Sequence, residues 1–225
     1  MNTGKNAATS TGNPGKRERN SSKSKQDILR AAEIKFAEKG IYGTRVDDIA
    51  ETANINKRML YEYFGNKEEL YKAVLAEVYG RLSKQEMVLL SGDMSCIDAM
   101  KKIIRLYFTF LKDNPTYVNL IIWENLNKGN YIKDIDFSNI KTPVFNLLRK
   151  VINKGKSDGI FRTDIYTEEV ILSLLTYTFS YFSNRYTLSK LLGREIDTEE
   201  SIKRRTDTVT EMFLRYLCVN RGGNN

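Results

Sequence analysis

From residue 25 onward, hydrophobic residues recur three or four positions apart, which is the spacing of one face of an α-helix. The first such run covers residues 25–39 and ends before Gly40, a residue type common just after helices. Two short helices are predicted next, at about 46–53 and 57–64, with the sequence ANIN between them. Because no alternation of apolar and polar positions is long enough for a strand, the pattern predicts an all-α fold.

Longer helices are predicted in the C-terminal two-thirds of the chain. Their expected bounds are about 67–88, 95–112, 115–127, 137–157, 167–189 and 198–219. Pro115 follows Asn114, a capping residue type, and suits the first position of a helix. Thr167 and the two Glu residues after it provide a hydroxyl cap and an acidic first turn, which also indicate the start of a helix.

The N-terminal segment differs from the rest of the chain in composition. Residues 1–24 are rich in Asn, Ser, Thr, Gly and Lys, so we predict a disordered basic tail. Residues 1–26 carry six Lys or Arg and one Glu, whereas residues 27–80 are slightly acidic, so the formal charge of +8 does not imply a basic globular face. The tail either lies along nucleic-acid phosphates or only keeps the protein in solution, and its low complexity favours the second interpretation.

Residue types on which many enzymes depend are missing. The chain has no histidine, which excludes Ser-His-Asp and Cys-His catalysis and every metal site that contains histidine. The string GKS at residues 155–157 resembles the end of a phosphate-binding loop, but Lys150 stands where that loop requires glycine, and a helical pattern precedes it. We therefore predict a protein that is not an enzyme and that holds no cofactor or metal.

The cysteines and the apolar runs indicate where the protein works. Cys96 and Cys218 are too few for a disulfide framework, so a reducing compartment is expected. The N-terminus has no apolar signal core. The longest apolar stretch, residues 170–182, is too short and too rich in hydroxyl groups to span a bilayer. The sequence therefore predicts a cytoplasmic protein without a membrane partner.

The second short helix has a basic and aromatic outer face. Leu60 and Phe64, four residues apart, form an apolar facet that can pack against the neighbouring helices. Lys57, Arg58 and Tyr61 share another facet, which is expected to face outward. Two short helices joined by a four-residue turn are typical of the helix-turn-helix, whose second helix enters the DNA major groove. Since short amphipathic helices are common, the facets alone leave DNA binding and a plain interaction module equally open.

A longer series of residues around this helix pair favours DNA binding over a plain interaction module. In order, the series is Phe36, Gly40, Thr44, Ile49-Ala50, Leu60-Tyr61, Tyr63-Phe64 and Asn66-Lys67-Glu68. On these residues, the segment 36–75 resembles the DNA-binding region of the TetR family of transcriptional regulators. The resemblance implies an N-terminal three-helix helix-turn-helix domain at 25–72 after the disordered tail at 1–24. It also implies a larger C-terminal helical domain at 73–225 for ligand binding and dimerisation.

Carried over by position, the resemblance implies a set of DNA contacts. The residues are Thr44, Asn56, Lys57, Arg58, Met59, Tyr61, Tyr63 and Lys67. Thr44 is expected to hold a phosphate with its hydroxyl and the free N–H groups of a helix start, and Lys67 to add a phosphate contact from the next helix. Arg58 can pair with both acceptors of a guanine, and Met59 can contact a thymine methyl. Glu62 is expected to point away from DNA.

The middle helices are rich in aromatic residues with polar residues between them. Each aromatic residue alone is explained most simply as packed core. As a group they can line a pocket with a few polar groups, and the resemblance implies that a small effector binds in this region. The candidate pocket residues are Tyr107, Trp123, Glu124, Asn127, Phe145 and Tyr177. Aromatic rings with Glu124 would suit a planar or cationic ligand.

The last two helices look apolar over more than one face, which a single core does not require. One helix-turn-helix reads about half of a DNA site, so proteins of this kind dimerise to read both halves. The candidate dimer residues are Leu175, Phe179, Phe182, Val209, Met212, Phe213 and Tyr216.

Together these features predict a homodimeric transcriptional regulator with a double-stranded DNA operator and a small-molecule effector as its partners. The expected activity is that of a repressor released from its operator by the effector. Two alternatives stay open: a DNA-organising or protein-recruiting regulator without an effector, and a helical interaction module.

Overall fold

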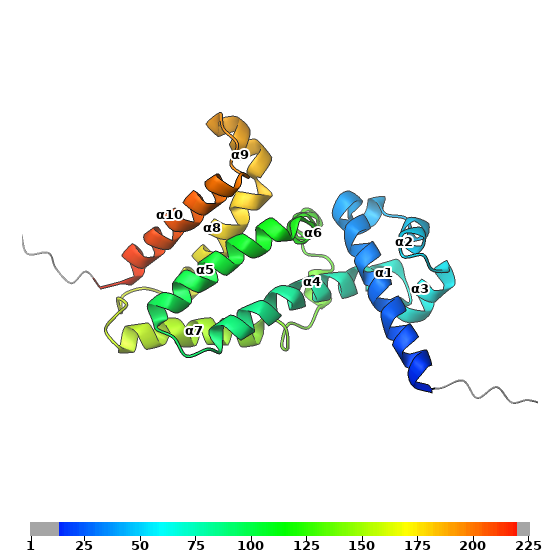
Figure 1. Cartoon of the computed structure of the whole chain (residues 1–225), viewed down its shortest axis with the longest axis horizontal. Helices are drawn as coiled ribbons and strands as arrows, with labels where there is room; N and C mark the ends of the chain where they lie inside the picture. The colour runs from blue at the N-terminus through cyan, green and yellow to red at the C-terminus, as the bar shows by residue number, and fades with distance from the viewer. Residues whose placement is uncertain (1–13, 220–225) are drawn as a thin grey trace, which may run out of the picture. The chain divides into compact units, whose positions relative to one another are not determined.

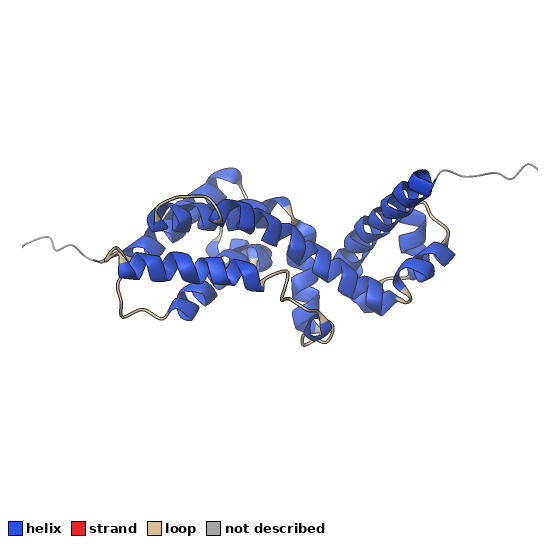
Figure 2. Ribbon diagram, turned by 90° about the horizontal axis from the view of Figure 1, so that it is seen from below, coloured by secondary structure: helices blue, strands red, loops and turns tan. Residues whose placement is uncertain are grey.

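The computed structural model describes the backbone of residues 14–219 and the side chains from residue 23 on. Within that range the chain is helical without a named strand, which confirms the all-α prediction (Figure 2). The helices are α1 (Pro14–Gly43), α2 (Val46–Thr52), α3 (Lys57–Phe64), α4 (Lys67–Leu90), α5 (Cys96–Asp113), α6 (Pro115–Leu126), the short 3-10 helix η1 (Ile132–Asp134), α7 (Thr142–Ser157), α8 (Thr167–Ser183), α9 (Arg185–Leu192) and α10 (Glu199–Leu217). In the described part, no helix combines the length and apolar character that a membrane span requires.

The chain divides into two compact units, with the boundary between Leu70 and Tyr71. Helices α1 to α3 form the first unit, and the first residues of α4 belong to it (Figure 1). The rest of α4 and the helices after it form the second unit. The boundary lies two residues before the one expected from the sequence, inside a continuous helix.

Small side chains on α1 let the first unit close around a few large ones. Ala31, Ala32 and Ala37 are buried beside Phe36, which is fully buried. Their small size allows α2 to approach closely and bury Ile49, and helices packed at such distances interlock their side chains. The helical conformation of α1 is interrupted at Gly40, whose φ of 65° is one that glycine adopts without strain.

The start of α1 corrects the expected tail. The helix begins at Pro14 rather than near residue 25, so the segment 14–24 is helical and not disordered. Pro14 suits the first turn of a helix, and the Lys, Arg, Glu and Gln residues that follow are good helix formers. The lack of apolar residues in this segment had suggested disorder. Residues 1–13, the rest of the expected tail, lie outside the described residues.

Helix α5 is the centre of the second unit. It packs against α6, α7, α8 and α10 (Figure 1). Its buried residues are Cys96, Ala99, Met100, Ile103, Ile104, Tyr107, Phe108, Phe110 and Leu111. Because each large apolar side chain contributes roughly 1.5–3 kcal/mol when fully buried, this helix supplies much of the unit's stability.

Two predicted helices differ from those in the structure. The run at 167–189 is broken at Asn184 into α8 and α9, and the Asn184 side-chain amide donates to the Ser180 carbonyl at 3.0 Å. Such local bonds compete with helix continuation. The helix expected from 137 begins only at Thr142, because the Asp136 carboxylate accepts from the Ser138 N–H at 2.9 Å and forms a turn.

Gly155 in α7 should tolerate no side chain. A Cβ atom there would lie 2.2 Å from Cδ2 of the fully buried Phe161 ring. We expect Gly155→Ala to lower the free energy of unfolding of the second unit by about 1–3 kcal/mol through overpacking. Urea denaturation followed by circular dichroism measures this change.

Gly80 in α4 provides the matched control. A Cβ atom at this position would meet nothing within 4 Å. Gly80→Ala should therefore raise stability by roughly 0.5–1 kcal/mol, the usual gain from replacing glycine inside a helix. Equal urea midpoints for the two variants would contradict the close packing of Gly155 on Phe161.

Candidate nucleic-acid interface and ligand cavity

The turn between α2 and α3 is built from residues that suit a tight bend. Asn54 has a φ of 53°, a left-handed conformation that asparagine adopts more readily than most residues. The Ile55 N–H donates to the Ala50 carbonyl at 3.0 Å. Asn56 caps α3, and its side-chain oxygen accepts from the Arg58 N–H at 2.8 Å. The turn and the cap therefore agree with the sequence-based expectation.

Burial of Leu60 sets the orientation of α3. Leu60 is fully buried, and Lys57, Arg58 and Tyr61 are exposed as the facets predicted. The Arg58 side chain is 84% exposed. Asn56 is also exposed, while Met59, Tyr63 and Lys67 are half-buried. One end and one side of α3 therefore offer two cations, an amide and a phenol to solvent, and their role in DNA binding stays a prediction.

Both cations of this face already have carboxylate partners. Lys57 Nζ lies 2.8 Å from Asp47 Oδ1, and Arg58 Nε lies 2.8 Å from Glu62 Oε1. The hydrogen bond to Asp47 raises the pKa of Lys57, so the ammonium stays charged at neutral pH. Exposed pairs of this kind contribute little stability. Both cations can therefore exchange a carboxylate for a phosphate or a base edge at low cost.

Thr44 does not have the surroundings expected of a phosphate ligand. It is 2% exposed, and its hydroxyl lies 2.7 Å from the Gly40 carbonyl and 3.0 Å from the Lys35 carbonyl. Its own carbonyl accepts from Lys67 Nζ at 3.2 Å. Thr44 thus closes the turn between α1 and α2, because the chain reverses there and leaves carbonyls that need donors.

Arg45 is a candidate contact that the sequence analysis missed. It occupies the N-cap position of α2 and is exposed. The family resemblance had placed the phosphate contact at Thr44, one residue before this cap position. The basic residue type and the position directly before the apolar Val46 are the sequence signals that point to Arg45.

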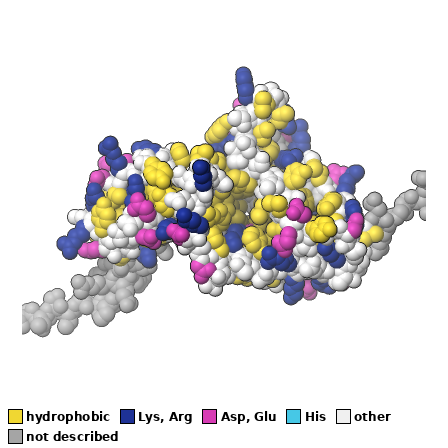
Figure 3. Space-filling view, turned by 180° about the vertical axis from the view of Figure 1, so that it is seen from behind, with side chains coloured by type: hydrophobic (Ala, Val, Ile, Leu, Met, Phe, Trp, Pro, Cys, Tyr) yellow, Lys and Arg dark blue, Asp and Glu magenta, His cyan; other side chains and the backbone are white. Residues whose placement is uncertain are grey.

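The second unit contains a cavity of about 510 Å³ whose lining includes residues from α4 to α8. Its aromatic lining residues are Tyr79, Tyr107, Tyr117, Phe137, Phe145 and Phe179. Hydrophobic side chains gather around a hollow in the space-filling view (Figure 3). Edge-to-face contacts order the rings, with Tyr79 centred 5.6 Å from Tyr117 and 5.2 Å from Phe137. The volume lies within the range of small-molecule sites.

A buried ion pair stands at the cavity wall. Lys141 Nζ donates to Glu86 Oε2 at 2.6 Å, and the Tyr107 hydroxyl donates to Glu86 Oε1 at 2.5 Å. The Glu86 side chain is 0% exposed and that of Lys141 9%. Burial lowers the pKa of Lys141 against the opposing effect of Glu86, and burial raises the pKa of Tyr107. Lys141 and Tyr107 line the cavity, whereas Glu86 supports them from behind.

The structure divides the predicted pocket residues between different places. Tyr107 and Phe145 line the cavity, but Trp123, Glu124 and Asn127 do not. The Glu124 carboxylate accepts from the N–H groups of Tyr131 at 2.7 Å and Ile132 at 2.8 Å. Through Oε1 it therefore closes the loop after α6. Asn127 ends α6 as its C-cap.

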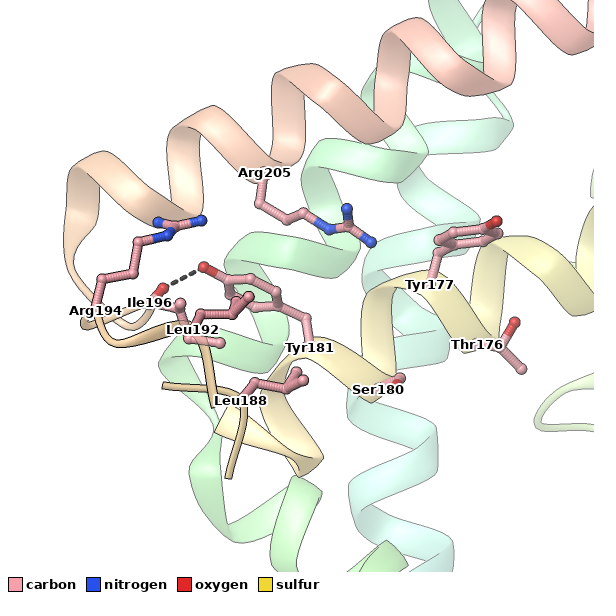
Figure 4. A pocket seen from close by; sticks show the side chains of 9 residues that line it. All are labelled: Thr176, Tyr177, Ser180, Tyr181, Leu188, Leu192, Arg194, Ile196 and Arg205. Carbon is pink, nitrogen blue, oxygen red and sulfur yellow. Dashed lines mark hydrogen bonds between the residues drawn. The ribbon is translucent and has the colours of Figure 1, made fainter. Parts of the chain in front are cut away.

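Tyr177, the remaining predicted pocket residue, faces a different hollow. This second hollow, of about 480 Å³, lies between α8, α9 and α10 (Figure 4). Figure 4 shows the Arg205 guanidinium extending from α10 toward Tyr177, whose ring centroid lies 5.9 Å away. The Tyr181 hydroxyl donates to the Ile196 carbonyl beside Arg194.

The predicted dimer residues also separate into three groups. Phe182, Val209 and Phe213 are buried inside the protomer, at 3%, 0% and 6% exposure, so they cannot form an interface. Leu175 and Phe179 line the cavity. Met212 and Tyr216 are exposed on α10. The predicted dimer residues separate in this way because α5 packs against both α8 and α10. This packing buries one of the two apolar faces that each of these helices carries.

Comparisons with known families cover most of the chain. The family model described as bacterial regulatory proteins, tetR family, matches residues 28–74. The model described as tetracyclin repressor-like, C-terminal domain, matches residues 97–213. The first match contains α2, α3 and the exposed face of α3. The second contains α5 except its first residue, α6 to α9 and most of α10.

One relative is similar along nearly its whole length. The HTH-type transcriptional repressor NicS of Pseudomonas putida is 28% identical over 204 residues, which are 90% of this chain and 96% of that protein. Its description is that of a transcription regulator and not of an enzyme.

Solved structures share the fold at low sequence identity. The fatty acid degradation regulator FadR from Bacillus halodurans has a TM-score of 0.68 and 18% identity, over 85% of this chain and 94% of that one. FadR from Bacillus subtilis, solved with stearoyl-CoA, has a TM-score of 0.65 and 14% identity, over 85% of this chain and 98% of that one. The first family model covers the helix-turn-helix, and the second covers more than half of the chain. The chain therefore belongs to the TetR family of DNA-binding transcriptional regulators.

Proposed function

We propose that the protein is a cytoplasmic, homodimeric repressor that leaves its operator when a small molecule enters the cavity of the second unit. The exposed face of α3, with Lys57, Arg58 and Tyr61, carries the DNA-binding part of this proposal. The similarity to NicS, described as a repressor, supports the direction of regulation.

On DNA, each side chain of α3 has a role that follows from its chemistry. Lys57 and Tyr61 bind phosphates, which position the helix in the groove without reading sequence. Arg58 reads guanine with its planar fork, and Met59 contacts a thymine methyl. Arg45 adds a phosphate contact in place of the buried Thr44. Asn56, Tyr63 and Lys67 complete the set at the edges of the contact.

The cavity is the proposed effector site. Its lining includes residues from α4 to α8, so a bound molecule contacts several helices at once. A ligand that binds one arrangement of these helices better than another shifts the population toward that arrangement. By linkage, the factor by which the ligand weakens DNA binding equals the factor by which DNA weakens ligand binding. Helix α4 carries Tyr79 of the cavity and begins in the DNA-binding unit. A fold relative, FadR from B. subtilis, was solved in complex with stearoyl-CoA, which supports the proposal that this chain also binds a small molecule.

Dimerisation is proposed through the exposed apolar residues of α8 and α10. Leu172 and Tyr177 on α8 are 53% and 40% exposed, and Met212 and Tyr216 on α10 are 44% and 48% exposed. Large apolar side chains gathered on one surface are typical of an interface. Two recognition helices about 34–36 Å apart, one turn of DNA, would then read a two-fold symmetric site.

The DNA-binding face is tested by substituting Lys57, Arg58 and Tyr61 by Ala together. DNA affinity should fall by at least about a hundredfold, since phosphate and base contacts are lost at once. The measurement is fluorescence anisotropy on a site selected by sequencing genomic fragments that the wild-type protein captures at near-physiological salt. Arg30→Ala, at an exposed position of α1, is the control and should bind as the wild type does.

Single substitutions separate the roles within this face. Arg58→Ala should cost about 1–3 kcal/mol and relax base preference at one position, whereas Lys57→Ala should weaken all sequences alike and reduce the salt slope by about one. Unchanged affinity in the triple variant would contradict the interface. Capture of dispersed sequences without symmetric sites would instead indicate a DNA-organising or protein-recruiting regulator.

The dimer face is tested by the double substitution Leu172→Glu and Met212→Glu. Four carboxylates would then oppose one another across a dimer, so the protein should become monomeric in sedimentation experiments and lose affinity for the symmetric site. Leu191→Glu on α9, at a position that is 80% exposed, is the control and should stay dimeric. A double variant that remains dimeric would place the interface elsewhere.

A further inference from the structure

The cavity of the second unit presents apolar surface and one strongly polar group. Lys141 lines it, and the structure gives its ammonium one hydrogen bond, to Glu86. An ammonium has three donors, so it can still donate to a ligand atom at the wall. Burial raises the pKa of Tyr79 to about 12, and the cavity tyrosines therefore stay neutral at pH 7.

The polar group carries no net charge as a unit. Glu86 is fully buried and receives one hydrogen bond on each carboxylate oxygen, from Lys141 and from Tyr107. The positive charge at the wall is therefore balanced before any ligand arrives. A ligand carboxylate would bring a second anion close to Glu86 in a low-dielectric site. Its contacts there would offset only part of the free-energy cost of its desolvation.

We infer that the effector of this cavity is an uncharged, largely aromatic molecule with a carbonyl-type oxygen that accepts a hydrogen bond from Lys141. A neutral acceptor uses the free donors of the ammonium and leaves the Lys141–Glu86 pair intact. The aromatic part of the ligand packs on the rings of the wall, of which Tyr79, Tyr117 and Phe137 are already ordered edge to face. This inference rests on the proposed function, because it assumes that the cavity is the effector site.

Two probes of nearly the same shape test the charge preference. Prodan is a dimethylaminonaphthalene with a neutral ketone, and the corresponding dimethylaminonaphthoate has a carboxylate in place of the ketone. Both fluoresce more strongly in apolar surroundings, so binding to the full-length protein can be titrated without DNA. We expect prodan to bind at least about tenfold more tightly, a difference of about 1.4 kcal/mol. Equal or tighter binding of the naphthoate, or binding of neither probe, overturns the inference.

Glu86→Gln tests the cause of this preference. The amide can still accept from Tyr107, but it no longer balances the charge of Lys141. The variant should therefore gain affinity for the naphthoate and lose its preference for prodan. An unchanged ratio of the two affinities would show that the ion pair does not set selectivity.

The double variant Glu86→Gln with Lys141→Met tests the hydrogen bond to the ligand. Both charges are removed together, so no buried charge is left unpaired, as it would be in Lys141→Met alone. Prodan should bind about tenfold more weakly, with no gain for the naphthoate, as expected for one lost hydrogen bond in a dry site. The emission of bound prodan should also move to shorter wavelength, because its ketone no longer accepts a hydrogen bond. Emission and affinity equal to those of the wild type would contradict the role of Lys141.

A pair of blocking variants locates the probe. Leu175→Trp fills the cavity, whereas Leu192→Trp fills the second hollow between α8, α9 and α10. Prodan binding should be lost in the first variant and kept in the second. The reverse result would place the ligand site in the other hollow.

Release from DNA is measured separately, by anisotropy of the captured site with and without prodan. A correct charge preference without release would contradict the proposed repressor mechanism and leave the inference on ligand chemistry standing. Release by the naphthoate but not by prodan would contradict the inference and leave the repressor mechanism standing.

Discussion

Helix α5 is buried over most of its circumference, with one exposed stripe that includes Lys101, Arg105 and Thr109, and the arrangement of the second unit depends on this constraint. Tyr107, Phe108, Phe110 and Leu111 are all at most 4% exposed, so four of five successive residues point into protein. A helix with an apolar surface on more than one side requires several packing partners. Helices α6, α7, α8 and α10 provide them.

The cavity and its charges follow from the same packing. Large aromatic rings contributed by α4 to α8 cannot fill the space between these helices completely, and about 510 Å³ remains. Tyr107 of α5 brings a hydroxyl to the wall of this space, and the hydroxyl needs an acceptor. Glu86 accepts it, and Lys141 then balances the buried carboxylate. One polar cluster thus supplies the acceptor that Tyr107 of α5 needs and places an ammonium donor at the wall of the cavity.

In the first unit, the short helix α3 is stabilised by packing on one side and by a cap. A helix of eight residues such as α3 is not stable alone, so it depends on packing through Leu60 and on the cap from Asn56. Because its packing is concentrated on the side that carries Leu60, the exposed sides of α3 are free to carry charge. The exposed cations there form only weak ion pairs with Asp47 and Glu62, which leaves them available to DNA.

Much of this protein was determined by its sequence alone. Helical periodicity identified all the elements of the first unit, the turn residues and the outward face of α3, because these depend on contacts within a few residues of each other. The family resemblance added the two-unit organisation. Composition was a poorer guide at the N-terminus, where a helix from Pro14 forms without an apolar face.

Only the tertiary structure decided how the apolar faces and buried polar groups are used. Periodicity shows that α8 and α10 have two apolar faces, but only packing on α5 shows that Val209 and Phe213 turn inward while Met212 stays exposed. Glu86 and Lys141 are 55 residues apart, and no local pattern indicates that they meet. Thr44 and Glu124 were assigned to ligands, whereas in the structure they satisfy backbone groups of turns. The physical reason is the same in each case: a buried polar group takes whichever partner the fold brings within hydrogen-bonding distance.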